Sequence, residues 1–545
     1  MTLLEQLEVD LGHRVSPSDK ADYQFACFTL AKEQGKSPLA LAEEMAKKFK
    51  SKVAHVEVSP PGFLNFYLTD DSLSKVGKEI LKSGNLPLPA TPKRLVFFDY
   101  GGANVAKELH IGHLRPPIIG EALRRVFMAF GHETIGDTHL GDFGMHMGLL
   151  VAELELMDKA EAKYITLEGL NEIYPRASKR KETDEAFKKR AGDLVLLMQQ
   201  KVEPFYSLWQ KIKDVSIPAI RKNYETLGCT FDTFEGDNCE FAPEMIAALK
   251  PGSTYMHDGC LLMDVRQDGE HIPVLDKDGK TTFKNPMPPV MLQKENGAVL
   301  YLTGDLATIH KRHTKYNASE YVYVVDARQS LHFVQAFRAA RKGGLVADNV
   351  KLVHVPLGTV NGKDGKPFKT RAGGTIKLED IINLVTESAK TRLAESGRTA
   401  DDETAQKIGL AALKFADLQN TVRKDYIFDI DKFTSFEGKT GPYLLYTIAR
   451  INSILEKADI KKSPLTLNRP IYTAILRLAD SFTGAMQNYT LNGIVDATYN
   501  LAQEFNNFYA HESIIKGGHT ELARLVKIAI EFALNALAID TVDRM

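Results

Sequence analysis

The segment LVFFDYGGANVAKELHIGHLRPPIIGEALRRVF, residues 95 to 127, decides the fold of the chain. Its first residues are apolar and are β-branched or aromatic, which is typical of a buried strand. After His113 the apolar residues repeat at helical spacing, and the pair Pro116-Pro117 fits only the first turn of a helix. The segment therefore predicts a strand, a turn that carries two histidines, and a helix that begins at about Leu114.

The histidine turn, His110-Ile111-Gly112-His113, then lies at the N-terminus of that helix. Unpaired backbone amides and the positive end of the helix dipole favour a phosphate at this place. The two imidazoles add hydrogen-bond donors for developing negative charge, and Gly112 lets a flat base approach the backbone. The alternative interpretation is a pair of surface or helix-capping histidines.

Other nucleotide-binding signatures are missing from the sequence. There is no G-x-G-x-x-G after a strand, and GTVNGKDGK lacks both the spacing and the Ser/Thr of a P-loop. A dinucleotide-dependent enzyme and a P-loop ATPase are therefore disfavoured.

The strand-like run RLVFFDY, residues 94–100, is the first of several. EYVYVVDAR and VKLVHVPLG are further strand-like runs that alternate with helical patterns, and such alternation predicts an α/β domain with a parallel sheet. We expect this domain to span 91–384, with an insertion at about 150–290 that contains helices and a hairpin-like stretch, DVRQDGEHIPVLDKDGKTTF.

Two further units flank the α/β domain. Residues 1–90 predict a small α+β domain, because KSPLALAEEMAKKF has helical spacing and VAHVEVSPPGFLNFYLTD reads as two strands about a Pro-Pro-Gly turn. The Pro-containing segment SGNLPLPATPKR is a plausible linker. Residues 385–545 predict an all-α bundle, because apolar residues repeat there at helical spacing with almost no strand signal.

Whole-chain properties set limits on partners and compartment. The 69 basic and 70 acidic residues give a formal net charge of -1, so an RNA partner would have to be held by local patches and by shape. No run approaches a membrane span, and the acidic start lacks the pattern of a signal peptide, which predicts a cytoplasmic protein. The four cysteines show no C-x-x-C spacing, so we expect free thiols and no structural zinc site.

Five long motifs follow one another along the chain: ANVAKELHIGHLRPPIIGEALRR, HLGDFGMHMGLLVA, YLTGDLA, VVDARQSLHFVQAF and GKDGKPFKTRAGGTIKLEDII. Together they resemble the arginyl-tRNA synthetases, which are class I aminoacyl-tRNA synthetases. SPPGFLNFYL near the start and FEGKTGPYLLYTIARI in the helical part extend the resemblance over nearly the whole chain. The resemblance implies a Rossmann-like catalytic domain between an N-terminal domain and an anticodon-binding bundle.

The reaction implied is attack of the arginine carboxylate on the α-phosphate of ATP, followed by transfer of arginine to the terminal ribose of tRNA(Arg). The partners implied are L-arginine, ATP with Mg²⁺, and tRNA(Arg), for a monomeric enzyme that uses no zinc and binds no membrane. Members of the family need bound tRNA before they activate arginine.

The resemblance assigns catalytic and ATP-binding roles to the histidine turn and to lysines. His110 and His113 match the signature histidines of the family, with Gly112 between them, and Lys107 shares the work on the phosphates. The loop NGKDGKPFKTRAGG corresponds to the mobile Lys-Met-Ser-Lys-Ser loop, although this chain has Lys-Pro-Phe-Lys-Thr there. The loop carries Lys363, Lys366, Lys369 and Arg371; Lys366 and Lys369 are nominated as catalytic, and Lys366 also as a contact to ATP. As a Lys/Gly run alone, the loop has an alternative reading as a solvated surface segment.

Recognition of arginine should use carboxylates and amide oxygens, because a paired acceptor tells the planar guanidinium fork from an ammonium. By resemblance, Asp305 pairs with the arginine side chain and Tyr301 flanks it. We expect Tyr301 at the end of a strand, where its alternative reading is an ordinary core or rim tyrosine. Asn104 and Gln329 match positions that contact the polar end of the amino acid. Asp237 stands where relatives have Glu, in TFEGDN.

For the RNA, the resemblance nominates contacts in both flanking units. Asn65 of GFLNF would touch the outer corner of the tRNA. Candidates for stacking on anticodon bases are Tyr443, Tyr446, Tyr509 and the terminal Met545. Each of the aromatics has an alternative reading as ordinary bundle core.

Two other functions remain open from the sequence. Small cytidylyl- and adenylyltransferases share the His-x-Gly-His turn, although they are usually far shorter and lack a helical RNA-binding appendage. A catalytically silent relative that only binds RNA is the second alternative, but it would have no need of His110, His113, Lys366 and Asp305.

Overall fold

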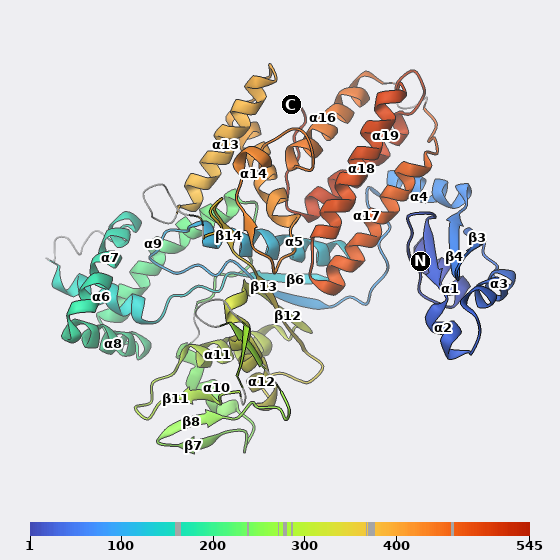
Figure 1. Ribbon diagram of the computed structural model, residues 1–545. Helices are drawn as coiled ribbons and strands as arrows, with labels where there is room; N and C mark the ends of the chain where they lie inside the picture. The colour runs from blue at the N-terminus through green and yellow to red at the C-terminus, as the bar shows by residue number, and fades with distance from the viewer. Residues whose placement is uncertain are drawn as a thin grey trace.

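The computed structural model describes residues 1–157, 165–236, 239–270, 272–275, 281–284, 287–366, 368, 376–458 and 463–545. Its centre is a four-stranded parallel sheet with strand order β13-β12-β5-β6. The strands are β5 (Leu95–Asp99), β6 (Glu133–Asp137), β12 (Glu320–Asp326) and β13 (Lys351–Leu357). Both the predicted parallel sheet and its three predicted strands are confirmed, and Figure 1 shows the sheet between the C-terminal helices above it and a group of helices and short strands below it.

Helix α5 (Arg115–Ala129) follows β5 through a short 3-10 turn, η1 (Ile111–His113). This start agrees with the helix predicted from about Leu114. The helix packs on the sheet through its apolar stripe, which includes Ile118, Ile119 and Leu123, all fully or almost fully buried. Its other side lies against helices of the bundle, so α5 joins the sheet to the C-terminal part of the chain.

One glycine lets α5 approach the sheet closely. A Cβ atom on Gly120 would lie 2.3 Å from the Cβ and Cγ atoms of Tyr100, which stands directly after β5. Any larger residue at this position would push the helix, and with it the histidine turn, away from the sheet.

The N-terminal unit is an antiparallel sheet of order β1-β2-β4-β3 with helices beside it. Strands β3 (Ala54–Ser59) and β4 (Phe63–Leu68) flank the Pro-Pro-Gly turn as predicted. The other elements are α1 (Leu3–Leu11), β1 (Ser16–Pro17), β2 (Tyr23–Ala26), α2 (Phe28–Glu33), α3 (Pro38–Lys48) and α4 (Asp70–Ser83). This unit lies beside α17 (Arg469–Asn488) of the C-terminal bundle (Figure 1), where Tyr23 Oη donates to Asp480 Oδ2 at 2.9 Å.

The segment between β6 and β12 forms two groups of elements. The first is a group of helices: α6 (Met145–Leu156), α7 (Leu167–Thr183), α8 (Glu185–Gln199) and α9 (Phe205–Thr226). The second combines the sheet β11-β8-β7 with the helix α11. Its elements are η2 (Cys239–Phe241), α10 (Ala242–Ala248), β7 (Tyr255–His257), β8 (Cys260–Met263), β11 (Val290–Gln293) and α11 (Tyr301–Tyr316). The predicted hairpin is confirmed as the antiparallel pair β9 (Ile272–Leu275) and β10 (Thr281–Lys284).

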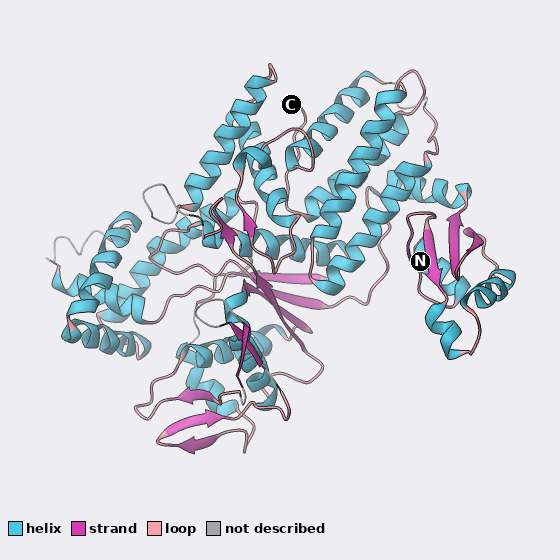
Figure 2. Cartoon of the chain, in the orientation of Figure 1, coloured by secondary structure: helices cyan, strands magenta, loops and turns pink. Residues whose placement is uncertain are grey.

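After β12 come η3 (Ala327–Gln329), α12 (Ser330–Lys342), β13 and the short β14 (Val360–Asn361). The bundle follows, and Figure 2 shows helices almost throughout this part. Its helices are α13 (Leu378–Glu395), α14 (Asp402–Leu418), α15 (Ile430–Phe433), α16 (Gly441–Lys457), α17 (Arg469–Asn488), α18 (Asn492–His511) and α19 (Thr520–Ala536).

Two details of this region were not apparent from helical periodicity. The expected domain boundary at 384/385 falls inside α13, because an apolar stripe reveals a helix but not the body on which it packs. The strand β15 (Tyr426–Ile427) pairs with β14 in parallel and so ties the bundle to the chain that leaves the sheet.

Two observations bear on the expectations for cysteines and membranes. Cys27 and Cys229 are buried free thiols and Cys260 is a half-buried one. Among the described helices, none has both the length and the apolar character that crossing a membrane requires.

Candidate functional site

A cavity of about 740 Å³ opens at the carboxyl ends of β5, β12 and β13. This edge of a parallel sheet is where ligands bind in open α/β folds. The cavity brings together most of the predicted site residues from distant parts of the sequence. Those that line it are Asn104, His110, Gly112, His113, Tyr301, Asp305 and Gln329.

The two histidines are fixed by the backbone of their own turn. The Gly112 amide donates to His110 Nδ1 at 3.0 Å, and the His110 amide donates to His113 Nδ1 at 3.1 Å. In its neutral form each ring therefore carries its proton on Nε2. Burial, followed by the charge of Lys107, lowers the pKa of His110, and burial together with His110 lowers the pKa of His113 to about 3. At neutral pH the pair supplies two uncharged donors.

The backbone amides of the histidine turn are not unpaired, which corrects the expectation from the sequence. The Ile111 amide donates to the carbonyl of Ile376 at 3.1 Å, and the Leu378 amide donates to the carbonyl of Leu109 at 2.9 Å. The Gly112 amide is taken by His110. The 3-10 geometry and this pairing with the chain before α13 use these amide donors and leave Nε2 of each imidazole as a donor of the turn.

The lysine-rich loop is described only at its ends. Lys366 is exposed and does not line the cavity, whereas Phe368 does line it and packs against Phe428 with ring centroids 5.0 Å apart. Lys363 Nζ lies 3.6 Å from Asp429 Oδ1. Lys369, which is predicted to be catalytic, and Arg371 of the same loop lie outside the described residues.

Lys107 lies near the histidine turn without lining the cavity. Its Nζ is 4.2 Å from the centroid of the Tyr174 ring on α7. The lysine is close enough for its charge to lower the pKa of both histidines.

Asp305 and Tyr301 occupy the first two turns of α11. Tyr301 is 56% exposed and is the first residue of this helix, so the expectation of a strand end is wrong. The short apolar run before it gives no period by which to tell a strand from a helix start. Asp305 is mostly buried; its Oδ2 lies 2.5 Å from His332 Nε2 and its Oδ1 lies 3.8 Å from His139 Nε2.

Of the remaining predicted arginine-binding residues, the structure describes Asn104 and Gln329. Asn104 follows β5 and forms a backbone bridge with Gly141, where a Cβ atom would lie 2.4 Å from Asn104 Oδ1. Gln329 ends the η3 turn after β12. Asp237 lies outside the described residues.

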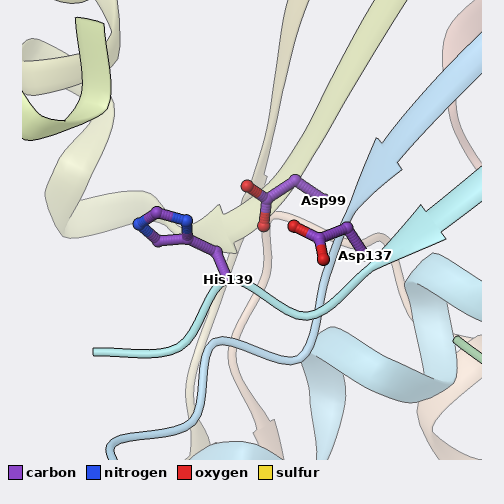
Figure 3. A group of neighbouring side chains, drawn as sticks. All are labelled: Asp99, Asp137 and His139. Carbon is purple, nitrogen blue, oxygen red and sulfur yellow. The ribbon is translucent and has the colours of Figure 1, made fainter. Parts of the chain in front are cut away.

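A buried ion cluster forms one wall of the cavity. Arg312, which is fully buried on α11, donates from Nη1 to Asp99 Oδ2 at 2.6 Å and from Nη2 to Asp137 Oδ2. Asp99 and Asp137 end the neighbouring strands β5 and β6, and Figure 3 shows their carboxylates side by side, with His139 on the segment that follows β6. Burial raises the pKa of Asp137 although Arg312 opposes this shift.

Two carboxylates and a histidine of this region form a candidate metal site. Ligand atoms of Asp99, Asp137 and His139 all lie within 4.8 Å of one another. Both carboxylates already accept a hydrogen bond from the Arg312 guanidinium, and a cation that used both as ligands would have to displace this group from the ends of both strands. These residues therefore do not fit a resident metal ion.

Several residues of the cavity were missed from the sequence. His139 and His146 lie in the motif HLGDFGMHMG, which contributed only to the family resemblance, and both line the cavity. Arg115 and Arg312 also line it. The position of Asp99 at the end of the first predicted strand was the one available signal, because polar residues at strand ends gather at the ligand-binding edge.

The predicted anticodon contacts form a cluster on the bundle. The Arg450 guanidinium lies over the rings of Tyr446 and Tyr509, at 4.7 and 5.0 Å from their centroids. Hydrogen bonds from Arg398 and Arg450 lower the pKa of Tyr446. Tyr443 is half-buried and its hydroxyl accepts from Asn506 Nδ2 at 2.9 Å. The cluster is thus partly core and partly surface.

Two RNA-contact predictions have weaker geometric support. Asn65 is only 7% exposed in the middle of β4, so its burial does not favour a contact with RNA. Met545 is half-buried against the bundle core.

Three family models match the chain in succession. Residues 4–68 match the arginyl tRNA synthetase N-terminal domain, residues 76–430 match the catalytic domain of the class I (R) tRNA synthetases, and residues 444–545 match the DALR anticodon-binding domain.

Similar proteins agree in length as well as in sequence. The chain is 37% identical to an arginine–tRNA ligase of Alkaliphilus oremlandii, over 97% of the chain and 95% of that protein. It is 35% identical to an arginine–tRNA ligase of Agathobacter rectalis, over 98% and 96%.

Solved structures share the fold. The arginyl-tRNA synthetase of Plasmodium falciparum superposes with a TM-score of 0.83 at 20% identity, over 100% of this chain and 98% of that one. The arginyl-tRNA synthetase of Thermus thermophilus gives 0.78 at 21% identity, with the same coverage.

Proposed function

The chain belongs to the family of arginyl-tRNA synthetases, and from that premise we propose that the cavity at the end of the central sheet is where arginine and ATP react. The enzyme is an arginine–tRNA ligase. It activates L-arginine with ATP and transfers the arginyl group to the 3'-terminal ribose of tRNA(Arg) for protein synthesis.

One observation carries the assignment of the cavity: a pair of neutral imidazole donors and a carboxylate face the same space. His110 and His113 lie on its α5 side and Asp305 lies on its α11 side. Uncharged donors suit the oxygens of a polyphosphate, and a carboxylate beside the ring of Tyr301 suits a planar guanidinium. Asn104 and Gln329 also line the cavity and have amide groups suited to the amino and carboxyl groups of the amino acid.

The chemistry needs alignment and charge stabilisation, not a covalent nucleophile. An oxygen of the arginine carboxylate forms a bond to the α-phosphorus of ATP, and the bond from that phosphorus to the bridging oxygen breaks, which releases pyrophosphate. A ribose hydroxyl of the tRNA then attacks the carbonyl carbon of arginyl-adenylate and AMP leaves. His110 and His113 donate from Nε2 to phosphate oxygens as negative charge moves onto the leaving group.

The lysines complete this proposal. Lys107 adds positive charge beside the histidines. Lys366 and Lys369 belong to the lysine-rich loop, in which Phe368 lines the cavity. Mg²⁺ would arrive with the phosphates of ATP, as is usual for this ion. No described side chain is assigned to this ion, because the nearby carboxylates, Asp99 and Asp137, are already paired with Arg312.

The remaining parts of the proposal concern tRNA and compartment. We assign anticodon contact to the cluster of Tyr446, Tyr509 and Arg450, whose rings and guanidinium offer stacking faces. The enzyme is proposed to act as a cytoplasmic monomer. No observation favours the small nucleotidyltransferases or the silent RNA-binding relative, whereas the chain matches catalytic and anticodon-binding models together.

The experiment that tests the cavity is the change Asp305→Ala. We expect arginine affinity, measured by calorimetry with tRNA present, to fall at least about a hundredfold, because the guanidinium loses its charged partner. ATP affinity should stay unchanged. Asp348→Ala removes an exposed carboxylate elsewhere in the chain and serves as the control. Unchanged arginine affinity in Asp305→Ala would reject the assigned pocket.

A further inference from the structure

The carboxylate proposed to bind arginine is itself held by a histidine. His332 lies in the first turn of α12, and its Nε2 is 2.5 Å from Asp305 Oδ2. Both side chains are largely shielded from solvent, with 20% and 16% of their surface exposed. A hydrogen bond between such groups, one of them ionised, is among the stronger side-chain interactions.

His332 reaches Asp305 from outside the cavity. Among the described residues that line the cavity, Asp305 and Tyr301 are present and His332 is not. Its ring instead packs against the ring of Tyr301, with centroids 5.0 Å apart, and edge-on against Phe333 at 5.6 Å. The histidine therefore supports the pocket wall from behind and does not itself meet the cavity.

This contact fixes an otherwise loose torsion. The terminal torsion of an aspartate is broad, so an isolated carboxylate does not hold one plane. A donor on Oδ2 selects one orientation and leaves Oδ1, together with the second lone pair of Oδ2, to other partners. A guanidinium fork requires such an orientation, because its two N–H groups must meet both oxygens in one plane.

We propose that His332 is a positioning residue for arginine recognition: through the bond from Nε2 to Asp305 Oδ2 it holds the carboxylate in the plane that a guanidinium fork requires. The inference rests on the proposed arginine pocket. It also makes His332 a determinant of specificity, because a freely rotating carboxylate still attracts an ammonium but loses the paired geometry that favours arginine over lysine.

Two substitutions separate the donor from the ring. His332→Phe keeps the aromatic contacts with Tyr301 and Phe333 and removes the donor, whereas His332→Gln replaces the ring and keeps an amide donor at comparable reach. In arginine-dependent exchange of pyrophosphate into ATP, with tRNA present, we expect His332→Phe to raise the KM for arginine about tenfold. The kcat and the KM for ATP should change less than about twofold.

The control results distinguish positioning from packing. His332→Gln should have a KM for arginine close to that of the parent protein. In His332→Phe, the inhibition constant of lysine should change by a smaller factor than the KM for arginine. Gln335→Ala, on the same helix, removes a hydrogen bond to the Pro288 carbonyl and should leave the kcat, both KM values and the inhibition constant of lysine unchanged.

A double-mutant cycle tests whether His332 acts through Asp305. In an Asp305→Asn background, His332→Phe should raise the arginine KM by less than about twofold, because the carboxylate that His332 orients has already been replaced by an amide. If the two effects multiply, or if His332→Phe raises the KM for arginine and ATP together, His332 has a general structural role and the inference is wrong. If Asp305→Asn lowers arginine affinity but His332→Phe does not, only this inference fails. An unaffected Asp305→Asn variant overturns the proposed pocket as well.

Discussion

Replacing Asp417 with asparagine should destabilise the junction between the catalytic sheet and the bundle. Asp417 is fully buried on α14, and both its oxygens lie 3.2–3.3 Å from Nε of Arg115, the first residue of α5. Arg115 is itself 3% exposed; it also donates from Nη1 to the carbonyl of Lys424 at 3.0 Å and lies over the ring of Tyr426. The Tyr426 hydroxyl donates to Asp417 Oδ2 at 3.1 Å.

The size of the effect follows from what remains after the change. Asparagine keeps the volume and an acceptor oxygen but removes the only carboxylate paired with Arg115 among the described residues. A buried charge left without its partner costs about 3–5 kcal/mol. For a cooperative unit of 150–250 residues this corresponds to a fall in melting temperature of roughly 6–20 °C.

The assay is thermal unfolding of the full chain, followed by far-ultraviolet circular dichroism. Glu403→Gln, which breaks an exposed pair with Lys407 on the same helix, is the control and should change stability by less than about 1 kcal/mol. The double variant Arg115→Met with Asp417→Leu should melt near the parent protein, because it leaves no unpaired charge. A melting temperature of Asp417→Asn within about 2 °C of the parent would refute the reasoning that this pair is buried and intact.

Three further outcomes follow from the geometry of the site. Arg312→Met should lower the free energy of unfolding by about 3–5 kcal/mol in urea titrations, because it leaves two adjacent carboxylates buried without their cation; a change below about 1 kcal/mol would contradict this. Gly120→Ala should raise the KM for ATP in pyrophosphate exchange, because its methyl group would lie against Tyr100 and move the histidine turn; an unchanged KM would show that the helix start tolerates the shift. His113 has a pKa of about 3 in the folded chain, below its unfolded value, so the unfolded chain binds more protons between pH 3 and 6.5 and stability falls as the pH drops through this window. The slope of melting temperature against pH should therefore be shallower in His113→Gln, and equal slopes would show that this imidazole is not kept neutral.

Local patterns were sufficient for the main elements of the fold. The strand at 95–99, the histidine turn and the helix after it each have a signature within a few residues, namely an apolar run, a Pro-Pro pair and a helical stripe. The parallel sheet followed from alternation of strands and helices. The same patterns put Tyr301 on a strand, because a short apolar run before a polar segment suits either element.

The contacts that finish the site depend on residues far apart in the sequence. Arg312 joins the ends of two strands that begin nearly forty residues apart, and His332 meets Asp305 from a different helix. Pairing of the histidine turn with the chain before α13 is likewise a product of folding, and it reverses the expectation of free amides. A linear sequence identifies such residues only where a family resemblance assigns their roles.

The most direct test of the account is exchange of labelled pyrophosphate into ATP with each amino acid in turn, with and without tRNA(Arg). We expect exchange that depends on arginine, requires the tRNA, resists competition by lysine and is lost in Asp305→Ala. Exchange driven by another amino acid, or none with any amino acid in folded protein that binds the tRNA, would contradict it.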